Sequence, residues 1–530
     1  MAAHLHDWLH LLLRWAHVLA GIMWIGDSFL FMWMDRTLTP PDPPRDGVTG
    51  ELFMVHGGGY YQLERRVFQP GRMPPLLHWF VWEATTTWVT GFLLLLAVYY
   101  VGGGALLVDP ASSLSLDAAA ALGLGSLAVS WLVYDALWSS PLGRSTPAAG
   151  AVSLLLFAAL AYGLALALSA RAAFLHAGAV LGTLMVMNVW VRILPAQRRM
   201  LAAVRRGEAV DPAPGLAAKK RSTHNSYMTV PVLFTMISNH FPATYGSRWA
   251  WLVLVLLALA GAAVRHFMLT RTARNAWLLG GAAAAVAVAF VLTAPETPRT
   301  RDAEERAAPA KPKASIDPVT VGTISGTVRL EGAPPARAQL SMASDCAPLH
   351  REPVLSESVV ADGGLLANVL VFIVSGAEAY EAPPPAGEVV IDQKGCVYLP
   401  HVVGARAGQA IAIRNSDPVL HNVHALAKRN GGFNLSMPVP GQVATKTFSK
   451  PEIVALKCDV HPWMGARIGV FDHPWFAVTD ARGAFTLSGV PPGRYVLTAW
   501  HETLGEKSAE VTVPPNGSAA ASISFAALMR

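Results

Sequence analysis

Four residues in the C-terminal half of the chain carry side chains that bind soft metals. Cys458, His461 and Met464 form a C-x2-H-x2-M pattern directly after an alternating apolar run, and His421 lies 37 residues before Cys458. One thiolate, two imidazoles and a weak axial thioether are the ligand set of a blue-copper electron-transfer site. A tight loop would supply three of these ligands, and a neighbouring strand would supply the fourth. The spacing therefore predicts a type 1 copper centre.

Two other interpretations of this motif fit it less well. A buried cysteine with chance histidine and methionine neighbours would account for C-x2-H alone. The full C-x2-H-x2-M pattern, with H-N-V-H upstream, is more specific than that. Zinc fits less well, because methionine is not among the usual zinc ligands.

Cys346 and Cys396 are the other two of the three cysteines. An even pair of cysteines in an oxidising compartment predicts a disulfide. The competing interpretation is a second metal site that includes His350 or His401. Peptide mapping under non-reducing conditions separates the two.

The N-terminal half contains ten histidines among long apolar runs. One face of the first run repeats polar or small residues at helical spacing: His10, Arg14, His17, Gly21, Trp24 and Asp27. Polar side chains inside a membrane helix are candidates for function, and paired histidines on facing helices can hold haem. We predict haem b as a second cofactor, with four candidate ligands: His17, His78, His176 and His240. The alternative is that each histidine only hydrogen-bonds a neighbouring helix.

Residues 51–75 combine three consecutive glycines with tyrosines and arginines. Glycine allows close approach of the backbone to a ligand, and arginine suits planar or anionic substrates. With one acidic residue of the next apolar run, this stretch supplies the candidate catalytic residues His56, Tyr60, Arg65, Arg72 and Glu83. The alternative is an ordinary basic loop on the cytoplasmic side.

The elements that position these residues follow from a division in composition. The chain has 530 residues, of which only 14% are charged, against about 25% in an average soluble protein. Residues 1–294 hold 20 Lys and Arg against 13 Asp and Glu, whereas the remainder holds 21 against 22. The basic residues flank apolar runs, which indicates membrane lipid rather than nucleic acid as the partner.

Apolar runs of about 20 residues predict membrane-spanning helices. We predict about eight, at residues 8–34, 76–100, 119–139, 148–169, 172–194, 227–241, 249–269 and 275–294. Alternate connections hold fifteen Lys and Arg against two. Under the positive-inside rule this places the N-terminus and the C-terminal half outside a bacterial inner membrane, in the periplasm.

The C-terminal half is predicted to be all β. Residues 295–320 are rich in proline, alanine and charge, which is typical of a flexible linker. Short alternating runs then recur every 8–12 residues or so, which predicts sandwich or barrel folds. The predicted domains are a membrane domain at 1–294, the linker, a copper domain at 321–472 and a β-sandwich at 473–530.

Long blocks of the apolar half resemble a known family. The sequences RWAHVLAGIMWIGDSFLF, GGGYYQLERRVFQPGRMPPLLHWFVWEATTTWVTGF and HNSYMTVPVLFTMISNHFP are similar to the membrane domain of bacterial membrane-bound urate oxidases. The resemblance covers about residues 8–295 and implies oxidation of urate to 5-hydroxyisourate, with O2 not the direct electron acceptor. Family members typically end in a cytochrome c domain. This chain lacks the C-x-x-C-H of covalent haem attachment, so its tail departs from that pattern.

The tail resembles two other groups of proteins. Residues 386–472 are similar to amicyanin-type cupredoxins, which implies His421, Cys458, His461 and Met464 as the ligands. The same resemblance implies that Asn422 steadies the site and that His424 does not bind the metal. Residues 473–530 resemble carboxypeptidase-regulatory-like β-sandwiches, which are usually structural, so His473 and His501 are not expected to be ligands.

Together these features predict a multi-domain chain with an α-helical membrane bundle followed by all-β cupredoxin-like and sandwich domains. Its predicted function is a urate-oxidising enzyme that passes electrons to a copper domain in place of cytochrome c. The expected onward acceptor is a soluble cytochrome or a terminal oxidase. Two alternatives remain: a non-enzymatic, membrane-anchored blue-copper electron-transfer or copper-handling protein, and a quinol-oxidising respiratory module.

Overall fold

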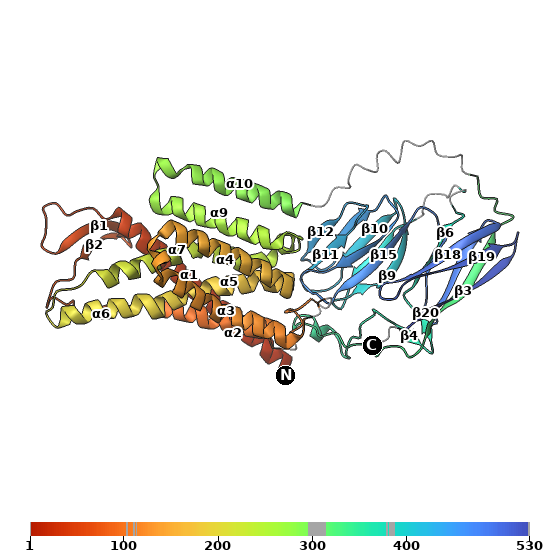
Figure 1. Ribbon diagram of the computed structural model, residues 1–530, viewed down its shortest axis with the longest axis horizontal. Helices are drawn as coiled ribbons and strands as arrows, with labels where there is room; N and C mark the ends of the chain where they lie inside the picture. Colours follow the sequence, from red (N-terminus) through yellow and green to blue (C-terminus); the bar gives the residue numbers. More distant parts are fainter. Residues whose placement is uncertain are drawn as a thin grey trace. The chain divides into compact units, whose positions relative to one another are not determined.

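The computed structural model describes residues 2–101, 104–109, 112, 114–294, 314–377, 380 and 387–527, with side chains from residue 8 onward. The chain divides into two compact units, Met1–Thr293 and Ala294–Arg530. The first is helical and the second is built of β-strands (Figure 1). Most of the predicted linker, residues 295–313, lies outside the described residues.

The N-terminal unit consists mainly of α-helices, most of them formed by the apolar runs. Their bounds are α1 Ala2–Thr37, α2 Trp82–Tyr99, α3 Leu116–Ser139, α4 Thr146–Ala167, α5 Ala170–Met187, α6 Leu194–Arg205, α7 Ala213–Ile237, α8 Pro242–Tyr245, α9 Ala250–Thr270 and α10 Trp277–Thr293. Short helical turns are η1 Pro141–Arg144, η2 Asn188–Ile193, η3 Ser238–His240 and η4 Ala273–Asn275. Serine side chains cap α3 and α5, since Ser115 and Ser169 each accept a hydrogen bond from a backbone N–H of the first turn.

Among the described residues, six helices are long and apolar enough to cross a membrane. They correspond to the predicted runs except 76–100 and 227–241, which form α2 and part of α7. Helix α2 has 18 residues, about 27 Å at 1.5 Å per residue, which is close to the hydrocarbon thickness. Large apolar side chains such as Trp15, Leu155 and Phe290 are more than 65% exposed on the bundle. This surface is consistent with a membrane protein, and the count of eight spans stays a prediction.

Helix α5 is the most deeply buried helix of the bundle, and one glycine sets its distance from α7. A Cβ atom at Gly178 would lie 2.1 Å from Oγ1 of Thr235 on α7. Contact this close requires glycine, so Gly178 lets the two helices approach. Gly182, one turn further along α5, has open space around its would-be Cβ.

The stretch at 51–75 folds largely as a hairpin of β1 (Val48–His56) and β2 (Gly59–Arg66). Gly57 and Gly58 make its turn with φ of 63° and 81°. These left-handed conformations favour glycine, which accounts for two of the three consecutive glycines without a ligand.

The C-terminal unit contains the remaining strands and one short helical turn, η5 (Ala347–Leu349). The strands are β3 Gly322–Glu331, β4 Ala361–Asp362, β5 Leu365–Leu366, β6 Leu370–Ser375, β7 Val389–Gln393, β8 Tyr398–Leu399, β9 Val402–Arg406, β10 Ala410–Asn415, β11 His421–Leu426, β12 Phe433–Met437, β13 Val443–Thr447, β14 Glu452–Lys457, β15 Gly465–Phe471, β16 Phe476–Val478, β17 Ala484–Val490, β18 Gly493–His501, β19 Gly505–Val513 and β20 Ser518–Ala526.

These strands make two sandwiches, each with its own buried core. One sandwich packs the sheet β13-β10-β7-β8 against β12-β11-β14-β15-β9. The other packs β16-β6-β18-β19 against β17-β3-β5-β4, with β20 parallel to β3. Strand β6, which the predicted domains placed with residues 321–472, pairs with β16 and β18 of the last segment. Strand pairing thus groups residues 322–375 with 476–526, and residues 389–471 form a sandwich between them in sequence.

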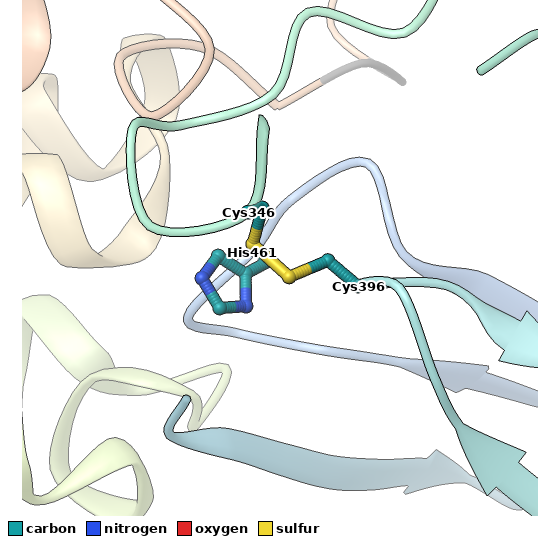
Figure 2. Close-up of side chains that lie close together, drawn as sticks. All are labelled: Cys346, Cys396 and His461. Atoms are coloured by element: carbon teal, nitrogen blue, oxygen red, sulfur yellow. A yellow bond between two sulfur atoms is a disulfide. The ribbon is translucent and has the colours of Figure 1, made fainter. Parts of the chain in front are cut away.

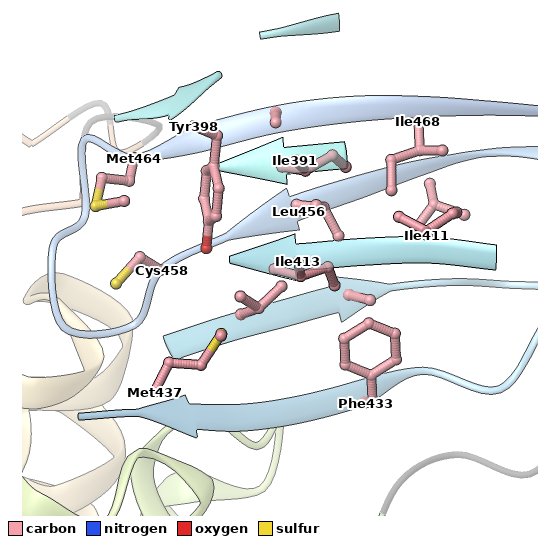
Figure 3. Close-up of a cluster of buried hydrophobic side chains, with 14 of the residues drawn as sticks. Ile391, Tyr398, Ile411, Ile413, Phe433, Met437, Leu456, Cys458, Met464 and Ile468 are labelled. Carbon is pink, nitrogen blue, oxygen red and sulfur yellow. The ribbon is translucent and has the colours of Figure 1, made fainter. Parts of the chain in front are cut away.

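The core of the 389–471 sandwich leads directly to the predicted metal ligands. Isoleucine and leucine side chains fill the space between its sheets along most of their length (Figure 3). At one end of the strands, Cys458, Met464, Met437 and Tyr398 replace them (Figure 3). All four are almost completely buried, so sulfur donors stand at the end of a rigid apolar core.

Candidate metal centre

Strand pairing brings the predicted ligands together from two adjoining strands and one loop. His421 is the first residue of β11, and Cys458 directly follows β14, which pairs with β11. The loop from Cys458 to Met464 then connects β14 to β15, whose pairing begins at Lys457 and Gly465. Residues far apart in sequence therefore meet at one end of a single sheet.

Backbone hydrogen bonds close this loop on itself. The N–H of Cys458 donates to the carbonyl of Met464 at 3.2 Å, and the N–H of Met464 donates to the carbonyl of His461 at 3.0 Å. The N–H of His461 also points at Sγ of Cys458, at 3.4 Å. Three of the predicted ligands are thus held in one turn by main-chain geometry.

The donor atoms of His421, Cys458 and His461 all lie within 4.8 Å of one another. The two Nδ1 atoms face each other at 2.9 Å, and Sγ of Cys458 is 3.9 Å from Nδ1 of His461. All three side chains are buried. A thiol and two imidazoles converging in this way could hold a metal ion, and buried Met464 adds a thioether at the same end of the core.

Asp417 fixes which nitrogen of His421 faces the other ligands. Its Oδ2 accepts a hydrogen bond from Nε2 of His421 at 2.9 Å. The backbone N–H groups of Gly395 and Cys396 donate to its two oxygens, each at 2.7 Å. Burial raises the pKa of Asp417, but these donors lower it by more, so the carboxyl pKa lies below its usual range. The carboxylate therefore holds the proton on Nε2, and Nδ1 is the nitrogen that faces the other donors.

Asn422 ties the ligand loop to β11. Its Oδ1 accepts from the N–H groups of Asp459 and Val460 at 2.6 and 3.2 Å and lies 3.3 Å from Sγ of Cys458. Its Nδ2 donates to Oδ1 of Asn434 and to Oδ2 of Asp459. Asn422 therefore holds the loop after Cys458 against β11, while its expected role at a copper site stays a prediction.

His424 contacts a carboxylate rather than the three converging donors. Its Nδ1 lies 2.9 Å from Oδ2 of Asp459, which is also paired with Lys457. Burial raises the pKa of Asp459, but its pairs with His424 and Lys457 lower it to about 2 overall.

At Cys458 the effect of burial is larger than that of the neighbouring backbone N–H groups, and it raises the pKa of the thiol to about 11.

Cys346 and Cys396 form a disulfide, beside His461 (Figure 2). His350 and His401, the histidines of the competing metal-site interpretation, bond elsewhere. Nε2 of His350 contacts the carbonyl of Gly395, and His401 contacts the carbonyl of Gly465 and the carboxylate of Glu502. Cys346 and Cys396 therefore bind each other, and neither His350 nor His401 joins them in a metal site.

Glu502 also pairs with a cation on β15, which links the two sandwiches. Its carboxylate contacts the guanidinium of Arg467 at 3.0 Å. Burial raises the pKa of Glu502, but the pairs with His401 and Arg467 lower it to a net value below its usual range. Burial instead lowers the pKa of neighbouring His501 to about 4, so that histidine is neutral at pH 7.

The histidines proposed as haem ligands are placed separately. His176 uses both ring nitrogens, Nδ1 with the carbonyl of Ala172 and Nε2 with the hydroxyl of Tyr100. Nδ1 of His17 contacts the carbonyl of Thr87, while His78 and His240 are exposed. His176 as placed offers no nitrogen to an iron, and this arrangement does not fit a haem there.

The five predicted catalytic residues also do not converge. His56, Tyr60 and Arg65 are exposed on the β1–β2 hairpin. Arg72 pairs with Asp46 at the surface. Glu83 lies in the first turn of α2. Among the described residues, no contact joins these five side chains to one another, so their catalytic role stays a prediction.

Sequence reasoning missed the residues that orient the ligands. Asp417 stands four residues before His421, and Tyr398 donates its hydroxyl to the carbonyls of Asn422 and Lys457. The signal for Asp417 was present in SDPVLHNVH, because a carboxylate commonly accepts the second N–H of a metal-binding histidine. Nothing in the sequence pattern marks Tyr398.

Comparison with known proteins assigns the N-terminal half to a class. Residues 3–294 match the family model for the urate oxidase N-terminal domain. This match spans more than half of the chain, and the chain therefore belongs to the urate oxidase N-terminal family. No curated protein matches it.

Solved structures match only a part of the chain. A Cu-containing nitrite reductase from Thermus scotoductus SA-01 is 23% identical with a TM-score of 0.15, over 19% of this chain and 25% of that one. A purple cupredoxin from Nitrosopumilus maritimus is 19% identical with a TM-score of 0.14, over 16% of this chain and 98% of that one. A Cu(I) amicyanin mutant is 23% identical with a TM-score of 0.15, over 19% of this chain and 97% of that one.

Proposed function

We propose that this chain is a membrane-bound enzyme that oxidises urate and passes the electrons to a type 1 copper centre in its β-rich half. Two observations support the proposal. Residues 3–294 belong to the urate oxidase N-terminal family. In the 389–471 sandwich, a buried thiol and two buried imidazoles converge within 4.8 Å, and this convergence carries the redox part of the proposal.

The donor set fits copper better than other common metals. Thiolate and thioether sulfur suit Cu(I), and imidazole suits Cu(II). Bound copper would supply a one-electron acceptor that returns to Cu(II) when it passes the electron on. His421, Cys458 and His461 would hold it, with Met464 as the weak axial ligand.

The protein's own part is to keep this geometry the same in both oxidation states. Asp417 keeps Nδ1 of His421 directed at the other donors, and Asn422 fixes the loop that carries Cys458. The buried core beneath them excludes water and resists rearrangement. Little therefore moves when an electron arrives or leaves.

The overall reaction balances with water as the source of oxygen. Urate and one water give 5-hydroxyisourate, two protons and two electrons. A single copper takes one electron at a time, so each turnover needs two successive transfers and an onward acceptor. We propose a soluble cytochrome or a terminal oxidase for that role.

The proposed location follows from the basic residues in the loops. Fifteen of them lie in one set of alternate connections and two in the other. This bias supports a location of the N-terminus and the β-rich half on the periplasmic side of a bacterial inner membrane. Disulfides form and persist in that compartment, and the Cys346–Cys396 bridge agrees with it.

The test is anaerobic incubation of the copper-loaded full chain with urate. We expect the blue absorbance to fade and 5-hydroxyisourate to form, in a ratio of two copper equivalents reduced per urate. Cys458→Ser should lose the blue colour and keep its fold. Copper that stays oxidised with urate but is reduced by a quinol would refute the proposal in favour of a quinol-oxidising module.

A further inference from the structure

A cluster of polar side chains lies where α3, η2 and α7 meet in the membrane unit. Asp135 of α3 receives two arginines: Arg192 of η2 and Arg221 of α7. Nη2 of Arg221 donates to Oδ1 of Asp135 at 2.9 Å, and Nε of Arg192 donates to the same oxygen at 2.8 Å. None of these residues belongs to the catalytic set predicted from the sequence.

The charges of this cluster do not cancel. Two guanidinium groups share one carboxylate, which leaves one positive charge in excess. The Arg221 side chain is 8% exposed and that of Asp135 is 19% exposed. Arg221 and Asp135 are the more buried pair, and the excess positive charge lies toward Arg192, whose side chain is 41% exposed. A bound monoanion would neutralise that excess charge next to the membrane domain.

A chain of hydrogen bonds extends from the ion pairs into the bundle. Nδ2 of Asn188 donates to the hydroxyl of Tyr134 at 3.0 Å and to Oδ1 of Asn225 at 2.9 Å. The Tyr134 hydroxyl lies 2.8 Å from Nδ1 of His224. The hydroxyl oxygen of Tyr134 accepts a hydrogen bond from Asn188, so the hydroxyl hydrogen of Tyr134 is donated to Nδ1 of His224. The proton of His224 then sits on Nε2.

Three atoms of this network are buried and have no partner among the described residues. They are Nη1 of Arg221, Oδ1 of Asn188 and Nε2 of His224. Buried polar atoms are normally hydrogen-bonded. The set consists of a charged donor, a neutral donor and an acceptor, which is the pattern that a heterocycle with both carbonyl and N–H groups would satisfy.

Aromatic rings flank these atoms. The Arg221 guanidinium lies over the Tyr134 ring, 5.0 Å from its centroid. The rings of Trp138 and His224 have centroids 4.0 Å apart, and Nζ of Lys220 lies 4.9 Å from the Trp138 ring. These rings and cations contact one another and surround the three atoms with flat side chains and positive charge, surroundings that suit a planar anion.

The backbone at this place is unusual as well. Residues Asn188–Ile193 form a π-helix between α5 and α6. Such turns are rare and frequently occur at functional sites. This one places both Asn188 and Arg192, and the Arg192 side chain is 41% exposed, so the cluster is open to the surface on that side.

We propose that Arg221, Asn188 and His224 form the binding site for a planar, monoanionic heterocycle, and that in this enzyme the ligand is the urate anion. The inference rests on the proposed function and replaces the exposed hairpin as the substrate site. Nη1 of Arg221 and Nε2 of His224 would donate to urate oxygens or nitrogens, and Oδ1 of Asn188 would accept from a urate N–H.

The test measures the KM of urate for copper reduction and the Kd of urate in the full-length protein in detergent. Arg221→Lys keeps the charge next to Asp135 and removes Nη1. We expect both constants to rise about 10- to 100-fold, as for the loss of a charge-assisted hydrogen bond. Asn188→Asp keeps an acceptor and adds a negative charge, and it should raise both constants as well.

Arg206→Lys is the matched control, because Arg206 is exposed and pairs with a single carboxylate, Glu208. It should leave both constants within twofold of the wild type. A single symmetric peak in size-exclusion chromatography and an unchanged copper spectrum show that each variant is folded.

The experiment distinguishes a failure of this inference from a failure of the proposed function. If wild-type copper is reduced by urate while Arg221→Lys and Asn188→Asp keep wild-type constants, this inference is wrong and the proposed function stands. A loss confined to Arg265→Lys would place the anion at Arg265, which is also buried among the described residues of the unit, and would also overturn it. Wild-type protein that neither binds urate nor is reduced by it refutes both.

Discussion

Replacing Asp417 with asparagine tests how the structure prepares its metal ligands. The carboxylate accepts three hydrogen bonds, from Nε2 of His421 and from the N–H groups of Gly395 and Cys396. The amide of asparagine is isosteric but keeps only one oxygen. In its best orientation Nδ2 faces the N–H of Gly395, while the oxygen retains Cys396 and His421. At least one buried donor is then unsatisfied.

The expected size of the effect on stability and on copper binding follows from the lost hydrogen bond and the lost negative charge. One unsatisfied buried N–H costs about 1–3 kcal/mol, and losing the negative charge weakens the bond that orients His421. Changing the partner of a ligating histidine typically lowers metal affinity by about 10- to 100-fold, which corresponds to about 1.4–2.7 kcal/mol. The first cost lowers the free energy of unfolding with or without copper. From the second we expect Asp417→Asn to weaken copper binding by about 10- to 100-fold.

The assay is a competition titration of copper between the full chain and a chelator of known affinity. Asp392→Asn is the matched control, since Asp392 is more exposed and accepts from the hydroxyl of Ser416. It should bind copper as the wild type does. Wild-type affinity and an unchanged visible spectrum in Asp417→Asn would refute the argument that this carboxylate orients His421.

Three further perturbations test other parts of the structure. Replacing Cys346 and Cys396 by alanine removes a disulfide that joins positions 50 residues apart, and should lower the free energy of unfolding by about 4 kcal/mol. Equal denaturation midpoints for the variant and the oxidised wild type would contradict this. Gly178→Ala should lower the melting temperature of the detergent-solubilised protein, because its Cβ meets a threonine of α7 at 2.1 Å, whereas Gly182→Ala should leave it unchanged or raise it; equal melting temperatures would show that the helices do not pack this way. Because its folded pKa is lowered, Glu502 contributes stability above the ordinary carboxyl pKa and loses it as the pH falls through the folded value. Denaturant titrations at pH 7 and in acid should therefore show a smaller acid loss in Glu502→Gln, and an equal loss would exclude the carboxylate as a cause.

The convergence of His421, Cys458 and His461 could be predicted from sequence because the pattern that marks these residues is local, while their binding of copper stays a prediction. C-x2-H-x2-M places three donors in one loop, and an alternating run before Cys458 fixes a strand end. His421 was singled out by the H-N-V-H pattern upstream of Cys458 and by the resemblance to amicyanin-type cupredoxins. Both steps rely on side-chain type and spacing, which are visible in the printed sequence.

The groups that support the ligands could not be found in the same way. Asp417 contacts Gly395 and Cys396 through tertiary folding, and Tyr398 reaches two carbonyls on separate strands. The pairing of β6 with β18 joins residues more than a hundred positions apart. Alternation of side chains predicts that a strand exists but does not specify its partner.

The membrane unit shows most clearly how far a site can be predicted from sequence alone. Glycines and arginines at 51–75 resemble a ligand-binding loop, yet two of the glycines serve a hairpin turn and the arginines face outward. The buried cluster around Arg221 draws its residues from α3, η2 and α7. These segments meet only through tertiary folding, so spacing along the chain does not show which of their polar residues come together.

The most direct test of the account is the rate at which urate reduces copper within one chain. Copper-loaded protein is mixed with saturating urate under anaerobic conditions, and the loss of blue absorbance is followed at several protein concentrations. Electron transfer inside the chain predicts a first-order rate that does not change on dilution and is lost in Cys458→Ser. No loss of colour with urate, or a rate that falls in proportion to protein concentration, would contradict it.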